Sequence, residues 1–276
     1  MKRLALLLGG VAALQLAGCM DEEVGTSEKT VPSFEEFESR TTVDIHGMYI
    51  VDGDIPINGR KNLREFYDRV FHPEDALIVD TMGPGGPDDK WAVTQRKQLT
   101  YCIGPTFDTT NKNLLIDAMQ KATDQGWERW GDVDFIYKPS EDANCNPSNN
   151  NVLFDVNQVS GQPFLARAFF PASPRAQRNV LVDTSSFVPD LDWPLYNILT
   201  HELGHSLGFR HEQDRDDTIG KDTNGEACKN LKTGPNPDWH LTTYDAKSIM
   251  NYCFCEASSD LSEFDVLSVQ ALYGRP

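Results

Sequence analysis

Positive charge is scarce in this sequence. Its 276 residues include 25 Lys and Arg against 42 Asp and Glu, which gives a formal net charge of −17 at pH 7. Phosphate backbones and anionic lipid surfaces repel such a chain, so we expect no nucleic-acid partner and no adhesion to anionic lipid. The acidic surplus indicates little about a substrate, because surplus charge usually lies on a solvated surface.

Several common functional signals are absent as well. We find no internal repeat, no glycine-rich loop that would cradle a phosphate, and no Ser or Cys arrangement typical of a nucleophile. A hydrophobic content of 39% fits a soluble globular protein. These observations exclude solenoids and give no support to nucleotide binding or covalent catalysis.

Long apolar runs are missing too, and the run from Leu4 to Leu16 is too short to span a bilayer comfortably. It follows Lys2 and Arg3, a pattern typical of an export signal. The run ends Leu-Ala-Gly-Cys19, which resembles a bacterial lipoprotein box in which residues 1–18 are removed and Cys19 is lipidated. The alternative is an ordinary signal peptide cut nearby. We therefore expect an exported, monomeric protein of the bacterial cell envelope (outer membrane or cell surface) or one released from it. Its only membrane contact would be a lipid anchor at Cys19.

Cysteine is sparse but informative in an exported chain, where disulfides are expected. Apart from Cys19 the sequence has Cys102, Cys145, Cys228, Cys253 and Cys255. The spacing does not fix their connectivity. We favour a bond between Cys102 and Cys145, and one from Cys228 to Cys253 or Cys255. A second zinc site at Cys253-x-Cys255 is the alternative for the last pair.

The segment His-Glu-Leu-Gly-His-Ser-Leu-Gly-Phe-Arg-His predicts a metal site. His201 and His205 are four residues apart, so on a helix their imidazoles lie on one face and can bind one ion. Gly208 can take the positive φ that ends the helix and brings His211 round as a third ligand. Three nitrogen ligands leave one zinc position for water, whose pKa zinc lowers to about 7. Glu202 can accept that water's proton, so the pattern predicts one catalytic Zn²⁺ ion. An amphipathic core helix with incidental histidines is the alternative, but such a match arises by chance with a probability on the order of 10⁻⁴.

A second segment, Tyr244 to Tyr252, contains Ser-Ile-Met-Asn-Tyr. Together the two segments resemble the metzincin metallopeptidases, which pair the long zinc motif with a methionine-containing turn. Phe-Arg before His211 and Ser-Ile-Met-x-Tyr are most similar to the astacins. The resemblance implies that Met250 forms an apolar floor under the ligands. It also implies that the Tyr252 hydroxyl can ligate the zinc at rest and stabilises the oxyanion during attack. Without the zinc motif, both residues would more often be ordinary core residues.

The same resemblance implies an α+β fold for most of the chain. We expect a twisted, mixed five-stranded sheet, an active-site helix, a Met-turn and a C-terminal helix that begins at Ser262 and ends before Gly274. The edge strand, residues 164–171, would bind an extended substrate by strand addition. A plain sheet edge is the compatible alternative. The strands that we expect are 99–103, 133–137, 152–156, 164–170 and 179–182, and a helix should cover 112–130 with Thr110 as its cap.

The chain divides at Gly83-Pro-Gly-Gly-Pro-Asp-Asp89, the clearest linker in the sequence. We predict a tether and pro-region at residues 19–89 and a catalytic domain at residues 90–276. Residues 20–42 are acidic and polar without a period, which favours a flexible tether. Residues 43–82 are expected to be partly ordered, with an extended segment at 48–51 and a helix through Leu63 and Val70.

Residues 51–55, Val-Asp-Gly-Asp-Ile, resemble the Phe-x-Gly-Asp segment of astacin pro-regions, with Val51 in place of the aromatic residue. The resemblance implies that Asp54 occupies the open zinc position and keeps the enzyme latent. A simple Asp-Gly turn between two short strands is the alternative.

The leading hypothesis is a secreted or envelope-anchored zinc endopeptidase that cleaves protein or peptide substrates. The alternatives are a surface protein that keeps the zinc fold for binding without turnover, and a hydrolase of a non-peptide amide. Glu202 favours an enzyme over the binding protein, since a structural site does not need a base.

Overall fold

The structure is a computed structural model, and it describes residues 31–71, 89–188, 191, 193–221, 227–228, 240–252 and 260–276. The predicted signal peptide, the lipidation site Cys19 and the linker up to residue 88 lie outside these ranges. Within the described ranges, no helix is both long and apolar enough to cross a bilayer.

The elements fall into an N-terminal lobe (residues 31–71) and a main body (residues 89–276). The lobe contains α1 (Phe34–Arg40), β1 (Thr42–Val43), β2 (Tyr49–Val51), β3 (Ile55–Ile57) and α2 (Gly59–Phe71). The strands of the main body are β4 (Leu99–Ile103), β5 (Phe135–Tyr137), β6 (Phe154–Val159), β7 (Ala166–Arg167) and β8 (Asn179–Asp183). Its α-helices are α3 (Thr109–Gln120), α4 (Glu128–Trp130), α5 (Leu195–Ser206) and α6 (Glu263–Tyr273).

The N-terminal lobe is a small folded unit with a core of its own. Its strands form an antiparallel sheet in the order β1-β2-β3, and Phe34 of α1 packs with Leu63 and Phe66 of α2. Strand β2 and helix α2 confirm the expected extended segment at 48–51 and the expected helix through Leu63 and Val70, while residues 72–82 lie outside the described ranges. Order begins earlier than predicted, because Ser33 and Glu36 form a capping box that starts α1 within the expected tether.

The main body contains the predicted mixed five-stranded sheet. Its order is β5-β4-β6-β8-β7, and all neighbours are parallel except β7 and β8. The edge strand is shorter than predicted: pairing with β8 covers only Ala166 and Arg167.

Helices cover one face of this sheet. Val180 and Val182 of β8 join Leu115 of α3 and Leu199 and Leu203 of α5 in the main core. Asp108 caps α3 through the N–H of Asn111, so the predicted Thr110 cap is wrong by two residues. A π-helical segment, Lys121–Trp127, then joins α3 to α4, so the predicted 112–130 helix is present but is kinked at Gly126, whose φ of −89° and ψ of −110° are not helical.

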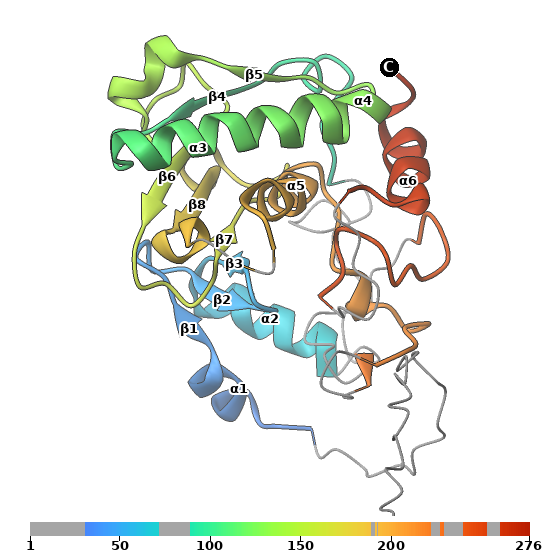
Figure 1. Ribbon diagram of the computed structural model, residues 1–276. Helices are drawn as coiled ribbons and strands as arrows, with labels where there is room; N and C mark the ends of the chain where they lie inside the picture. Colours follow the sequence, from blue (N-terminus) through green and yellow to red (C-terminus); the bar gives the residue numbers. More distant parts are fainter. Residues whose placement is uncertain are drawn as a thin grey trace, which may run out of the picture.

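The N-terminal lobe covers the other face of the sheet. Side chains alternate along a strand, so Leu181 points away from the helices, where it packs with Phe164, Met48 and Ile50. In Figure 1 the blue N-terminal elements accordingly lie beyond β7 and β8, on the side away from α3. The expected substrate-binding edge is therefore buried under residues of the same chain.

A buried ion pair fixes the lobe to β7. The Nε and Nη2 atoms of Arg167 lie 2.7 and 2.6 Å from Oδ2 of Asp44, and Nη1 donates to Asn179 at 2.8 Å. Both charged side chains are at most 1% exposed. Losing one partner of such a pair costs about 3–5 kcal/mol, because the other charge stays buried and unpaired. The lobe is therefore held by charge as well as by apolar contact.

The described cross-link and the caps of the C-terminal helix match the sequence analysis. The predicted disulfide between Cys102 and Cys145 is present, with the Cα atoms 5.6 Å apart. Cys228 is disulfide-bonded, whereas its candidate partners Cys253 and Cys255 lie outside the described residues. Helix α6 starts with the predicted Ser262 capping box and ends at Gly274.

The first described residues of the main body dock at the end of α5. Gly208 has φ +101°, and the carbonyl oxygen of Asp89 lies 2.2 Å from where a Cβ atom would sit. Nearby, the indole N–H of Trp91 donates to the carbonyl of Ser206, and the Tyr273 hydroxyl donates to that of Leu207. These contacts satisfy carbonyls that a helix end leaves without partners.

We predict that Gly208→Ala destabilises the protein more than Gly161→Ala does. Both glycines have positive φ, which costs a residue with a Cβ atom about 1–2 kcal/mol, but no atom lies within 4 Å of the Cβ position at Gly161. Thermal unfolding of both variants measures the difference. Equal losses would show that the approach of Asp89 does not constrain the turn.

Candidate metal centre and active site

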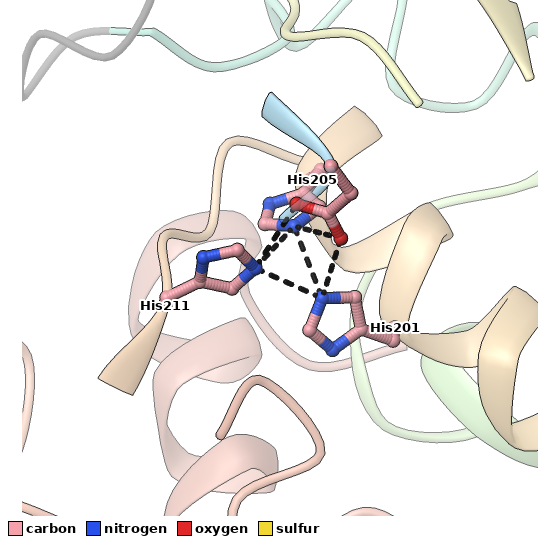
Figure 2. A group of neighbouring side chains, drawn as sticks. His201, His205 and His211 are labelled. Atoms are coloured by element: carbon pink, nitrogen blue, oxygen red, sulfur yellow. Dashed lines mark hydrogen bonds and ion pairs between the residues drawn. The ribbon is translucent and has the colours of Figure 1, made fainter. Parts of the chain in front are cut away.

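Three imidazoles, those of His201, His205 and His211, point toward one another (Figure 2). His201 and His205 lie one turn apart on α5, and His211 follows the turn at Gly208. Each of the three is 1% exposed, and every pair of their Nε2 atoms is 3.1 Å apart. The structure thus brings together the three side chains that the sequence proposed as ligands.

The outer nitrogen of each ring has an acceptor. Nδ1 of His201 lies 2.7 Å from the carbonyl of Ile249, and Nδ1 of His205 lies 2.8 Å from that of Phe209. Nδ1 of His211 contacts the carboxylate of Asp52. Since carbonyl and carboxylate oxygens only accept, Nδ1 carries the proton in each ring and Nε2 presents its lone pair inward.

Three inward lone pairs 3.1 Å apart repel one another unless a cation lies among them. Burial lowers the pKa of His205 to about 4, so this ring is neutral. Burial also opposes protonation of His211, but the charges of Asp52 and Asp54 outweigh it and raise its pKa well above the ordinary value. One positive charge, a proton or a metal ion, therefore suits the cluster. Tetrahedral zinc with Zn–N bonds of 2.0–2.1 Å needs ligand nitrogens about 3.3 Å apart, so the residues present fit zinc.

A carboxylate of the N-terminal lobe completes the cluster. Oδ2 of Asp54 lies 3.3 Å from Nε2 of His201 and 3.6 Å from Nε2 of His205, and Oδ1 lies 3.3 Å from Nε2 of His211. One ligand atom from each of the four residues lies within 4.8 Å of the others. Burial alone would raise the pKa of Asp54, yet the adjoining imidazoles lower it well below the ordinary value. The carboxylate is therefore ionised and placed as a fourth ligand.

Glu202 lies beside the cluster and is 2% exposed. It accepts the Ala168 N–H, while its Oε2 has no hydrogen-bond partner among the described residues. Burial and, next, the charge of Asp54 raise its pKa well above the ordinary value. Glu202 thus has a raised pKa and an Oε2 atom that makes no hydrogen bond within the described residues, and a general base needs both properties.

Tyr252 lies against the same cluster. Its ring stacks on His201 with centroids 5.0 Å apart, and its hydroxyl donates to Oδ2 of Asp54. Burial, and then Asp54 and Glu202, raise its pKa well above the ordinary value, so the hydroxyl keeps its proton. It is a donor directed at the atom that occupies the fourth position.

Met250 lies beneath the helix that carries the ligands. Its sulfur is 2.4 Å from where a Cβ atom on Gly204 would sit, so a glycine is required between the two histidines of α5. The neighbouring carbonyl of Ile249 is the acceptor for His201, which fixes that ring to the turn. The turn at Ile249 and Met250 therefore packs against the helix that carries His201 and His205.

Sequence reasoning missed one residue of the site, Asp52. It stood in a predicted Asp-Gly turn, and nothing local indicates that its carboxylate reaches an imidazole 159 positions away. The local signal was the turn itself, which places Asp52 and Asp54 together in the connection between β2 and β3. Gly53 between them lies against the Tyr252 ring, 3.0 Å from its Cε2 atom at the Cβ position.

Comparisons with known proteins bear on this site. Two solved structures show limited likeness: myroilysin (15% identity, TM-score 0.45, covering 69% of this chain and 98% of that one) and high choriolytic enzyme 1, a hatching enzyme zinc-protease from Oryzias latipes, the medaka fish (16% identity, TM-score 0.41, 68% and 96%). No curated protein matches the chain. The dual-action HEIGH metallo-peptidase family, peptidase M57, matches residues 92–273, which is more than half of the chain. The family name spells the residues of its motif, His-Glu-Ile-Gly-His. At residues 201–205 this chain has His-Glu-Leu-Gly-His, with Leu203 at the third position. The chain belongs to the dual-action HEIGH metallo-peptidases.

Proposed function

We propose that this metallopeptidase is an exported zinc endopeptidase that carries one catalytic ion, bound by His201, His205 and His211. The observation that supports this most directly is the set of three Nε2 atoms, each pair 3.1 Å apart, beside a buried glutamate. When bound there, zinc supplies Lewis acidity that polarises a carbonyl and lowers the pKa of water. The substrate would be a protein or peptide, and the chain would act as a monomer.

Two side chains perform the proton and charge chemistry in this proposal. Glu202 takes a proton from the attacking water and passes it to the leaving amine, since its free oxygen lies next to the ligand cluster. The Tyr252 hydroxyl donates a hydrogen bond to the developing oxyanion. Its present acceptor, Asp54, occupies the position that a substrate oxygen would need.

The third part of the proposal is latency, as in the astacin-like arrangement. The N-terminal lobe acts as a pro-region, and its Asp54 takes the fourth metal position. The lobe also buries β7, the edge on which an extended substrate would pair. Activation would require the lobe to leave, and cleavage in the segment between Phe71 and Asp89 would begin that process.

The proposal places the protein in the bacterial envelope. The support is the sequence alone: a short apolar run after two positive charges, ending at Cys19. Residues 1–18 would be removed, and acyl chains on Cys19 would anchor the mature chain, because two membrane signals suffice for stable anchoring.

Asp54→Ala in the full-length chain should raise cleavage of an unfolded protein substrate by at least about tenfold, because the tethered carboxylate competes at a high effective concentration. The control is Glu65→Ala, which removes an exposed carboxylate of the same lobe. A rate unchanged by Asp54→Ala would mean that Asp54 does not inhibit.

Glu202→Gln, made in the Asp54→Ala background, should keep zinc and lose nearly all turnover, since the ligands survive and the base does not. His201→Ala, His205→Ala and His211→Ala should instead lower the zinc content. Elemental analysis and cleavage assays, with and without a chelator, separate the two effects. A glutamine variant within tenfold of its parent would contradict the mechanism.

Tyr252→Phe in the same background should lower turnover by a factor on the order of 10²–10³ while zinc is retained, as when one oxyanion donor is removed. Tyr244→Phe is the matched control, because that hydroxyl accepts from Asn251 on the same loop. Loss of zinc with an unchanged rate per bound ion would make Tyr252 structural instead.

Mass spectrometry of the exported protein should find acyl chains on an N-terminal Cys19. An unmodified N-terminus at another residue would reject the lipoprotein prediction and leave ordinary secretion as the alternative.

A further inference from the structure

The three imidazoles are not held in the same way. His201 and His205 are oriented by the backbone carbonyls of Ile249 and Phe209, both in the main body. His211 is oriented by Asp52, a residue of the N-terminal lobe. The partner of a ligand's second nitrogen fixes the ring's direction and raises its basicity. One of the three proposed ligands therefore depends on a segment outside the peptidase domain.

The structure accommodates Asp52 in an unfavourable backbone conformation. Its φ of +49° is the only positive value among the described residues that are not glycine. Aspartate is one of the few residues that tolerate this region, and such conformations persist where the surroundings demand them. The side chain is 4% exposed, and that of His211 is fully buried. The contact is thus a shielded one between a carboxylate and an imidazole, unlike an exposed surface pair.

A second carboxylate lies at the same place. Asp214 follows His211 on the short helix η5 (Glu212–Asp214) and is 4% exposed. Ligand atoms of Asp52, His211 and Asp214 all lie within 4.8 Å of one another. Asp214 belongs to the main body, so it stays beside His211 when the N-terminal lobe moves.

We propose that Asp52 is a positioning residue for the metal ligand His211 in the full-length chain, and that Asp214 takes over this hydrogen bond when the lobe leaves. The inference rests on the proposed zinc site. A buried N–H group needs an acceptor, and Asp214 is the carboxylate of the main body grouped with His211. The N-terminal lobe then does two things at once: Asp54 closes the metal site, and Asp52 strengthens it.

The test is a double-mutant cycle on the full-length chain, with the zinc dissociation constant measured by competition with a chelator. Asp52→Gly removes the carboxylate and suits the positive φ. It should weaken zinc binding by up to about tenfold, because Asp214 can replace it. Asp214→Ala alone should change binding less. The double variant should lose about 10–100-fold, more than the two single effects combined, as loss of the partner of a ligand histidine typically does.

Asp52→Asn is the rescue variant, since its amide oxygen still accepts and asparagine tolerates positive φ. It should bind zinc more tightly than Asp52→Gly. Repeating the cycle in the Asp54→Ala background separates orientation of His211 from direct ligation by Asp54. Circular dichroism checks that the double variant of Asp52→Gly and Asp214→Ala folds. If it does not, the double variant of Asp52→Asn and Asp214→Asn replaces it, and a smaller but still non-additive loss of zinc affinity is expected.

Two outcomes would overturn the inference. Zinc affinity unchanged in both Asp52→Gly and the double variant would show that Asp52 does not position the ligand, and purely additive effects would show that Asp214 does not replace it. A wild-type chain that binds no zinc would instead reject the proposed function, so the two failures can be told apart.

Discussion

The arrangement of segments around the three histidines follows from one constraint: three buried imidazole lone pairs must lie close together. Nε2 atoms separated by 3.1 Å are stable only around a positive charge, and each ring must be fixed from behind. That requirement explains features that are far apart in the sequence. The turn at Ile249 places a backbone carbonyl that accepts from Nδ1 of His201. The turn after Gly208 places the Phe209 carbonyl, which accepts from Nδ1 of His205. The packing around α5 serves this geometry.

The same requirement explains how the N-terminal lobe is integrated. A carboxylate is stable in a buried site only next to positive charge, and the imidazole cluster supplies it for Asp54. Away from the cluster, Arg167 supplies it for Asp44. Both lobe carboxylates are thus neutralised by the main body, and the clusters around Phe164 and Phe170 add apolar contact. Attachment of the lobe through Asp44 and placement of Asp54 at the histidine cluster therefore use the same kind of interaction.

Local patterns made much of this predictable. Histidine spacing identified the cluster, the Ser262 capping box placed α6, and the five predicted strands correspond in order to those of the sheet. The edge strand was predicted too long, since its pairing with β8 covers only Ala166 and Arg167. Asp52 was missed because its partner lies 159 residues away. Thr110 was chosen as a cap although Asp108, two residues earlier, accepts the Asn111 N–H.

These contacts also bear on what cleavage of the linker can achieve. Cutting between Phe71 and Asp89 removes a covalent connection but none of the contacts between lobe and body. The buried pair of Asp44 and Arg167 would still have to separate, which leaves a guanidinium unpaired until water reaches it. After the cut, however, the lobe is no longer tethered to the main body. Its rebinding then depends on the concentration of free lobe and no longer on the effective concentration that the linker sets. In the proposed latent enzyme, dilution and digestion of the freed lobe would then favour the open site, so the linker would control how long inhibition lasts, while the buried charges would control how strong it is.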